Sequence, residues 1–191
     1  RFDDPNLTSC FDAYVIQVEQ CQDRLKALGT TLEEVAGTKL WQGAVNRLGG
    51  LRGIATLSAL TLAAEVGDFQ RFGHAKDFMG FVGLVPSEYS SGGSRRQGSI
   101  TKTGNAHVRR VLVGAAWHYR HRPTLGGALA KRLTGQPKEV KDLSWKAQER
   151  LNLKFRRLTG RGKRSTVAVV AVARELAGFV WALMARTPAA A

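Results

Sequence analysis

Residues 165–184 read STVAVVAVARELAGFVWALM, and this apolar run decides how the chain folds. A membrane span needs about 20 predominantly apolar residues, and here Arg174 and Glu175 interrupt the stretch from Val167 to Met184. We therefore predict a buried helix in the core of a globular domain, and we expect no membrane partner.

Most of the other segments also repeat apolar residues at helical spacing. Steps of three and four recur over 7–28, 54–66, 73–82, 108–119 and 140–158. The segment 83–105 lacks this period and is rich in Ser, Gly and Thr, so it is a loop or a hairpin. The predicted fold class is mainly α: a helical stalk or coiled-coil remnant, then a compact helical domain with an irregular Ser/Gly-rich loop at 86–105.

The N-terminal apolar stripe continues beyond residue 28. Thr31 is a suitable N-cap, with Glu33 and Glu34 in the first turn of a second helix that ends near Trp41. We therefore predict two helices that form a hairpin or a short coiled coil, with contact to a partner as the alternative.

Two cysteines, Cys10 and Cys21, fall in the first of these helices. Eleven residues at about 1.5 Å each hold them roughly 16 Å apart, which is too far for a disulfide within one straight helix. We expect a reducing, cytoplasmic setting.

A glycine-rich turn, RLGGLRG at 47–53, precedes the helix predicted at 54–66. Residues 48–66 resemble part of a helix-hairpin-helix, a motif whose tight turn offers backbone N–H groups to a phosphate. The match is partial, because Arg52 stands where the motif usually has its second glycine. Nonspecific DNA contact and simple packing are both open readings of this turn.

The whole chain has 29 Lys and Arg against 15 Asp and Glu, and the positive charge is concentrated in its second half. Residues 1–90 hold 8 basic and 11 acidic side chains, whereas residues 91–191 hold 21 basic and 4 acidic ones. Such an excess is typical of a surface that binds a polyanion, and a merely solvated basic face is the alternative. The candidate nucleic-acid contacts are Arg109, Arg110, Arg120, Arg122, Arg156, Arg157, Lys163 and Arg164.

Motifs of hydrolases and metal enzymes do not occur in the sequence, which lacks HExxH, CxxC, GxSxG and Walker patterns. We expect no metal and no cofactor in this chain. The remaining candidate is the segment from Ser90 to Arg96, where a serine hydroxyl beside Gly92 and Gly93 is open to a phosphodiester. The arginines that follow suit its nonbridging oxygens. A surface loop beside solvated arginines is the alternative.

One segment, residues 83–117, reads GLVPSEYSSGGSRRQGSITKTGNAHVRRVLVGAAW. Together with the LGGL turn at 48–51 and AEVGDFQRF at 64–72, it resembles the transposase segment of the IS-one-ten family. These are DEDD-class insertion-sequence transposases, related to the Piv pilin-gene invertase. The resemblance is strong over residues 44–120 and looser near the C-terminus.

This resemblance implies a recombinase guided by a bridge RNA. In the family, an N-terminal RuvC-like domain with four metal-binding acidic residues acts with a C-terminal domain whose nucleophilic serine directly precedes a glycine. After Pro86 and Tyr89 the matching position is Ser91, with Ser90 as its rival.

The other roles that we expect follow from this assignment. Arg95, Arg96 and Lys102 would stabilise the transition state at the attacked phosphate, and Arg109 and Arg110 would clamp flanking DNA or guide RNA. Expected partners are DNA, bridge RNA and further copies of the chain, as a dimer or tetramer, in a nucleoid-associated cytoplasmic complex.

No segment matches the RuvC-like domain, so we expect a fragment with a stalk remnant at 1–47 and a transposase domain at 48–187. Mg²⁺ would belong to the missing domain, and Glu65 and Asp68 are interpreted as an ordinary helix end rather than substitute ligands. Two rival interpretations are a noncatalytic nucleic-acid-binding module and an oligomerisation protein built on residues 7–47.

Overall fold

The computed structural model describes residues 2–91 and 94–185, except for the side chains of 89–97. The elements in chain order are α1 (Pro5–Ala36), α2 (Gln42–Leu48), α3 (Thr56–Val66), α4 (Ala75–Phe81), β1 (Pro86–Ser91), β2 (Ser94–Ile100), α5 (Ala106–Ala116), the short 3₁₀ helix η1 (Trp117–Arg120), α6 (Gly127–Leu133), α7 (Lys138–Gly160) and α8 (Ser165–Ala185). The prediction of a mainly α-helical fold is confirmed.

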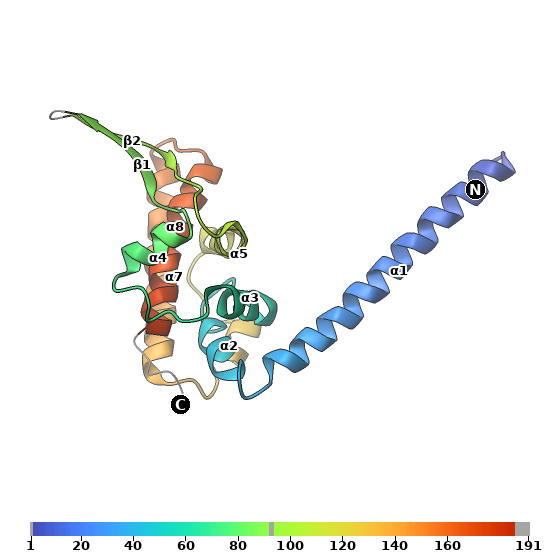
Figure 1. Ribbon diagram of the computed structural model, residues 1–191, viewed down its shortest axis with the longest axis horizontal. Helices are drawn as coiled ribbons and strands as arrows, with labels where there is room; N and C mark the ends of the chain where they lie inside the picture. The colour runs from blue at the N-terminus through green and yellow to red at the C-terminus, as the bar shows by residue number, and fades with distance from the viewer. Residues whose placement is uncertain (1, 92–93, 186–191) are drawn as a thin grey trace.

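Helix α8 runs through the middle of the globular body, where it contacts α7, α5, α4 and α2 (Figure 1). Its small and branched residues from Ala168 to Leu183 are buried on the sides that face these helices. By length and composition alone this helix could cross a membrane, yet half of its apolar stretch is covered by the rest of the chain. The predicted core helix is confirmed.

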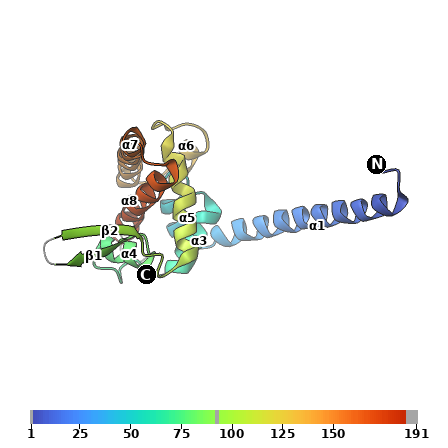
Figure 2. The same ribbon diagram turned by 90° about the horizontal axis from the view of Figure 1, so that it is seen from above.

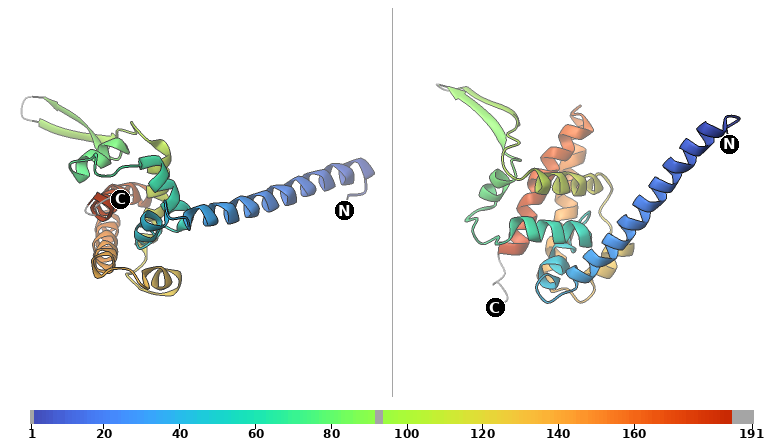
Figure 3. Two further views of the ribbon diagram at one scale, coloured as in Figure 1. Left: turned by 60° about the horizontal axis from the view of Figure 1, so that its bottom comes forward. Right: turned by 45° about the vertical axis from the view of Figure 1, so that its right-hand side comes forward.

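Helix α1 extends away from the body as a single rod, and Figure 3 shows this in two further views. The predicted break at Thr31 is wrong. The hydroxyls of Thr30 and Thr31 donate to the carbonyls of Lys26 and Ala27, four residues earlier, so both threonines are accommodated inside the helix instead of capping a new one. The expected two-helix hairpin is therefore absent from this segment.

Most of α1 is solvent-exposed, and Ala36, at its last turn, is its buried residue. Cys10 and Cys21 are free and exposed on this one helix, as the spacing argument predicted. Helix α1 contacts the body at its C-terminal end, against α3, and the chain continues into α2, which packs on α3 and α8.

The glycine turn between α2 and α3 is buried rather than open to a phosphate. Its Gly49 and Gly50 carbonyls accept hydrogen bonds from Arg132 Nε and from Ser144 Oγ, at 2.8 and 2.6 Å. Gly53 has a φ of +84°, and a Cβ there would overlap the carbonyl oxygen of Ala115. Of the two readings left open by the sequence, the structure therefore favours packing.

Arg52 also faces inward at this turn. Its Nη1 donates to the Arg122 carbonyl at 2.8 Å and to Gln148 Oε1 at 3.2 Å. The arginine thus ties the turn to α7 and to the chain after η1.

Candidate nucleic-acid interface

The Ser/Gly-rich segment forms an antiparallel hairpin that projects from the body (Figure 1). Of the loop and the hairpin that the sequence allowed for residues 83–105, the structure has the hairpin. The register pairs Ser91 with Ser94, Ser90 with Arg95, and Tyr89 with Arg96, with an irregularity between Pro86 and Glu88. Seen from above, the hairpin and α1 leave the body on opposite sides (Figure 2). The expected role of Gly92 and Gly93 lies outside the described residues.

The base of the hairpin is a crossing of two chain segments at Gly83 and Gly104. Both glycines have positive φ, +69° and +78°. A Cβ on Gly83 would overlap the Thr103 carbonyl oxygen, and one on Gly104 would overlap the Phe81 carbonyl oxygen. Only glycine meets both requirements at once, because it has no Cβ and tolerates the left-handed region. This crossing sets where the hairpin leaves the body.

Hydrogen bonds reinforce the crossing. The backbone N–H groups of Lys102 and Asn105 donate to the carbonyls of Gly83 and Phe81, at 3.1 and 3.0 Å. Arg109 reaches back from α5 and donates from Nη1 to the carbonyl of Val82 at 2.7 Å. Arg109, a predicted nucleic-acid contact, therefore has an internal partner and positions the hairpin base.

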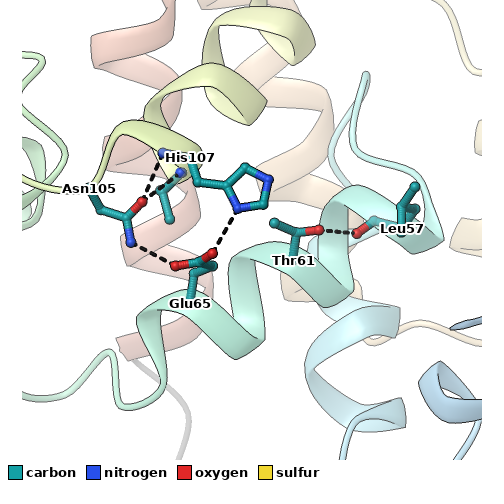
Figure 4. Close-up of polar contacts among 6 residues, drawn as sticks. Leu57, Thr61, Glu65, Asn105 and His107 are labelled. Atoms are coloured by element: carbon teal, nitrogen blue, oxygen red, sulfur yellow. Dashed lines mark hydrogen bonds and ion pairs between the residues drawn. The ribbon is translucent and has the colours of Figure 1, made fainter.

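The start of α5 is held by a polar cluster that sequence reasoning missed (Figure 4). Asn105 caps the helix by accepting from the N–H groups of His107 and Val108, and its Nδ2 donates to Glu65 Oε2 at 2.9 Å. Glu65 Oε1 lies 2.7 Å from His107 Nδ1. The hydrogen bonds from Asn105 and His107 lower the pKa of Glu65. Glu65 thus closes α3 onto α5, consistent with its interpretation as a structural helix end.

The four predicted catalytic residues do not form one group. Ser91, Arg95 and Arg96 lie together at the far end of the hairpin by backbone register. Lys102 follows the other end of β2, and the six steps from Ser94 to Ile100 span about 20 Å at strand geometry. Within one chain, Lys102 is therefore too far from Ser91 to contact the same phosphate. A compact loop could have brought the two residues together, but an extended strand separates them.

The remaining predicted nucleic-acid contacts are all exposed arginine and lysine side chains. Arg110 is on α5, and Arg120 lies at the end of η1 with its guanidinium 5.8 Å from the Trp117 ring centre. Arg122 follows η1 and uses its carbonyl to accept from Arg52. At the end of α7 and in the turn to α8, the exposed cations are Arg156, Arg157, Lys163 and Arg164.

A charged cluster between α7 and α8 was also missed. Glu175 accepts from Arg150 Nε and from Lys154 Nζ, the latter at 2.7 Å. Burial alone would raise the pKa of Glu175, but the hydrogen bonds from Lys154 and Arg150 outweigh it and the pKa is lowered. The signal was visible in the sequence, since Arg174 and Glu175 interrupt the most apolar segment.

The described residues do not fit a catalytic metal ion. Among them, no three His, Cys, Asp or Glu side chains come together as potential ligands. Two acidic residues, Glu65 and Asp68, lie at the end of α3. The carboxylate of Glu65 already forms hydrogen bonds with Asn105 and His107.

Comparison with known proteins decides the family. Residues 45–128 match the family described as Transposase IS116/IS110/IS902, a region that begins in α2 and includes the hairpin and α5. This segment belongs to that transposase family. The expected resemblance is confirmed.

The sequence similarity to several relatives extends over more of the chain than residues 45–128. The transposase-like protein y4qE of Sinorhizobium fredii is 48% identical over 71% of this chain and 35% of its own length. The transposase for insertion sequence element IS1533 of Leptospira borgpetersenii is 29% identical over 86% of this chain and 48% of its own. The transposase for insertion sequence element IS1111A of Coxiella burnetii is 33% identical over 52% and 28%. The chain spans less than half the length of these relatives.

Proposed function

We propose that this chain is the DNA-strand-transfer domain of an insertion-sequence transposase and that Ser91 is its nucleophile. The observation that carries the proposal is the position of Ser91 at the end of β1, on a projecting hairpin inside the family region 45–128. A residue at the end of a two-stranded arm reaches a DNA backbone without requiring the body to approach the duplex.

In the proposed step, Ser91 Oγ attacks a DNA phosphorus. A bond between Oγ and phosphorus forms, the bond from phosphorus to the 3′ oxygen breaks, and the 3′ oxygen takes a proton. The product is a 5′-phosphoserine ester that conserves the bond for rejoining. Arg95 and Arg96 are the residues whose charge suits the developing negative charge on the phosphate oxygens. Lys102 is omitted from this set because of its distance along β2.

Partners of the whole protein follow from the same proposal. DNA and a bridge RNA would contact the exposed cations of α5, α7 and the turn before α8, including Arg110 and Arg156. Residues 1–47 would form a stalk and 48–187 the transposase domain. The exposed apolar side chains of α1 support assembly with further copies, as a dimer or tetramer, and the site of action would be the cytoplasmic nucleoid. Mg²⁺ would be held by a RuvC-like domain outside this chain.

The decisive experiment traps the covalent intermediate. Protein expressed from the reading frame extended upstream of Arg1 is mixed with bridge RNA, Mg²⁺ and a labelled DNA that is nicked so that it cannot be rejoined. A denaturing gel compares the wild type with Ser91→Ala, and Ser90→Ala is the matched control. We expect a shifted protein–DNA band that only Ser91→Ala abolishes. Specific binding without any covalent band would refute the nucleophile.

The 191-residue chain gives a second test. We expect it to bind DNA and to cleave little or none of it, because the proposed metal site belongs to the RuvC-like domain. Efficient cleavage that survives Ser91→Ala would contradict the proposal.

A noncatalytic nucleic-acid-binding module is the second candidate, favoured by the exposed cations at the end of α7. It predicts that binding weakens steeply with salt, because each phosphate contact releases counterions, and that no covalent product forms in any combination of partners.

A further inference from the structure

A cavity of about 460 Å³ lies between the base of the hairpin and the first half of α8. This volume is within the range of about 300–1,000 Å³ that is usual for small-molecule sites. One wall comes from the hairpin base, with Leu84, Pro86 and Ile100, and the other from α8, with Val167, Val170 and Ala171. The interior is therefore mostly apolar and bounded by elements far apart in the sequence.

Two cations on this cavity have no acidic partner in the described part of the chain. Lys102 and Arg174 both line it, and among the described residues no carboxylate pairs with either. Arg174 is half-buried, so its guanidinium gives up part of its hydration without gaining a counter-charge from any residue that the structure describes. The third cation on the cavity, Lys154, already pairs with Glu175. The unmatched charge indicates an anionic ligand.

The backbone fixes the position of Lys102 beside the glycine crossing. Lys102 has a φ of +59°, an uncommon conformation for a residue with a side chain, and its N–H donates to the Gly83 carbonyl. Thr166, in the first turn of α8, also lines the cavity. This turn is the N-terminal end of α8, where the helix dipole favours a negative charge. Val167 in the same turn is 54% exposed, which leaves an apolar surface beside these positive groups.

We propose that this cavity takes one unpaired nucleotide of a single-stranded nucleic acid. Its base would lie against Val167, Val170 and Pro86, and its phosphate would contact Lys102 and Arg174. A nucleotide carries an apolar face and a negative charge in one unit, which matches an apolar wall with cations on its edge. The inference rests on the proposed function, because it names a specific nucleic-acid site for that domain.

The test separates the base from the phosphate. A fluorescent 12-residue single strand and a fully abasic strand with the same number of phosphates are titrated with the 191-residue chain, and anisotropy gives each Kd. We expect the wild type to bind the normal strand about tenfold more tightly than the abasic one, because only the normal strand has a base whose apolar face the cavity removes from water. DNA and RNA versions of the normal strand show which of the two sugars the site prefers.

Three variants locate the effect. Arg174→Gln removes the half-buried charge, and Val167→Glu adds an opposing charge at an exposed position where folding is least affected. Each should reduce the preference for the normal strand from about tenfold to about twofold or less. Lys131→Ala removes one charge from an exposed position on α6 and should keep the full preference. Circular dichroism melts verify that each variant is folded.

The outcomes separate this inference from the proposed function. Equal affinity for normal and abasic strands would overturn the nucleotide site while leaving electrostatic DNA binding intact. A preference that survives both Arg174→Gln and Val167→Glu would also overturn it, because the base would then bind elsewhere. Displacement of the strand by a poly-Glu peptide, with the same sensitivity to both variants, would assign the cavity to an acidic protein segment instead. Failure to bind either strand would remove the nucleic-acid partner itself.

Discussion

Two long helices of this chain, α1 and α8, differ in how far their apolar side chains are buried. Helix α8 buries its apolar residues against four other helices, whereas α1 leaves large apolar side chains exposed along most of its length. Phe11, Tyr14 and Leu25 are among the exposed ones. Helical spacing predicted the first part of α1 and the apolar run at 165–184 predicted α8, but burial depends on whether other elements surround the helix.

The comparison also separates two uses of charge. In α8, Glu175 is tied to α7 by Arg150 and Lys154, so the charge holds two core helices together. In α1, the acidic residues stand on a helix that touches the body only at its end. If this comparison is right, substitutions in α8 should change the stability of the domain, and equivalent substitutions in α1 should not.

The largest effect should come from a core leucine. Leu176 is fully buried in α8, so Leu176→Ala should lower the free energy of unfolding by about 2–5 kcal/mol. Leu25→Ala on α1 is the matched control, and because Leu25 is 70% exposed we expect about 0.5 kcal/mol or less. Urea unfolding at low protein concentration measures both. Equal losses would show that α1 contributes to the folded domain as much as α8 does.

Next in size is the ion cluster between α7 and α8. Glu175→Gln should lower the free energy of unfolding at pH 7 by about 1–2 kcal/mol, because Arg150 and Lys154 lose their shared carboxylate. Glu19→Gln on the exposed face of α1 removes the same charge as a control. A Glu175→Gln effect no larger than that of the control would show that the cluster is not a stabilising link.

The same cluster gives a pH dependence. The pKa of Glu175 is lowered in the folded chain, so its contribution is complete above the ordinary value of 4.5 and is lost as pH falls through the folded value. Unfolding measured from pH 7 to pH 3 should therefore show a loss of stability below about pH 4.5 that is smaller in Glu175→Gln. Identical pH profiles for the two proteins would contradict this assignment.

A single hydrogen bond should have a smaller effect. Trp181 Nε1 donates to the carbonyl of Phe72 at 3.0 Å, linking α8 to the segment before α4. Trp181→Phe should cost about 1 kcal/mol, because it leaves this carbonyl without its donor. Tyr14→Phe on α1 also removes one polar group from an aromatic ring, and its effect should be negligible because Tyr14 is 71% exposed. Thermal melts compare the two variants.

The smallest effect compares one substitution in both helices. Gly29→Ala in α1 adds a methyl group with no neighbour within 4 Å, so it should stabilise that helix by about 0.5 kcal/mol. A Cβ at Gly178 in α8 would lie 3.0 Å from Met79 Cε, so Gly178→Ala should gain less or lose stability. Amide hydrogen exchange, which resolves each helix separately, measures both. Greater protection of α8 than of α1 would reverse the comparison.

Much of the fold could be predicted from local signals. The apolar run at 165–184 and the helical spacing over 54–66 and 108–119 correspond to observed elements. The prediction failed at Thr31, where a residue with good capping chemistry used its hydroxyl for a bond within the helix. Capping propensity identifies suitable residues, but it does not decide whether the helix ends there.

The candidate site was predictable only in part. The family segment could be found from sequence, because motif order is a linear property, and the assignment of Ser91 rests on the same motif order and stays a prediction. The separation of Lys102 from Ser91 could not, since eleven residues permit either a compact loop or an extended arm, and strand pairing chose the arm. The cavity beside Arg174 was equally hidden, because its two walls come from segments more than 60 residues apart.

The sequence by itself determined the helical class, the basic second half, the free cysteines and the transposase family, because each depends on composition, local spacing or motif order. Only the tertiary structure decided that the glycine turn is buried and that Arg52 and Arg109 donate hydrogen bonds to backbone carbonyls. It also decided that Lys102 and Arg174 line the same cavity. Those outcomes depend on which distant groups compete for the same donors, and such competition exists only once the helices have packed.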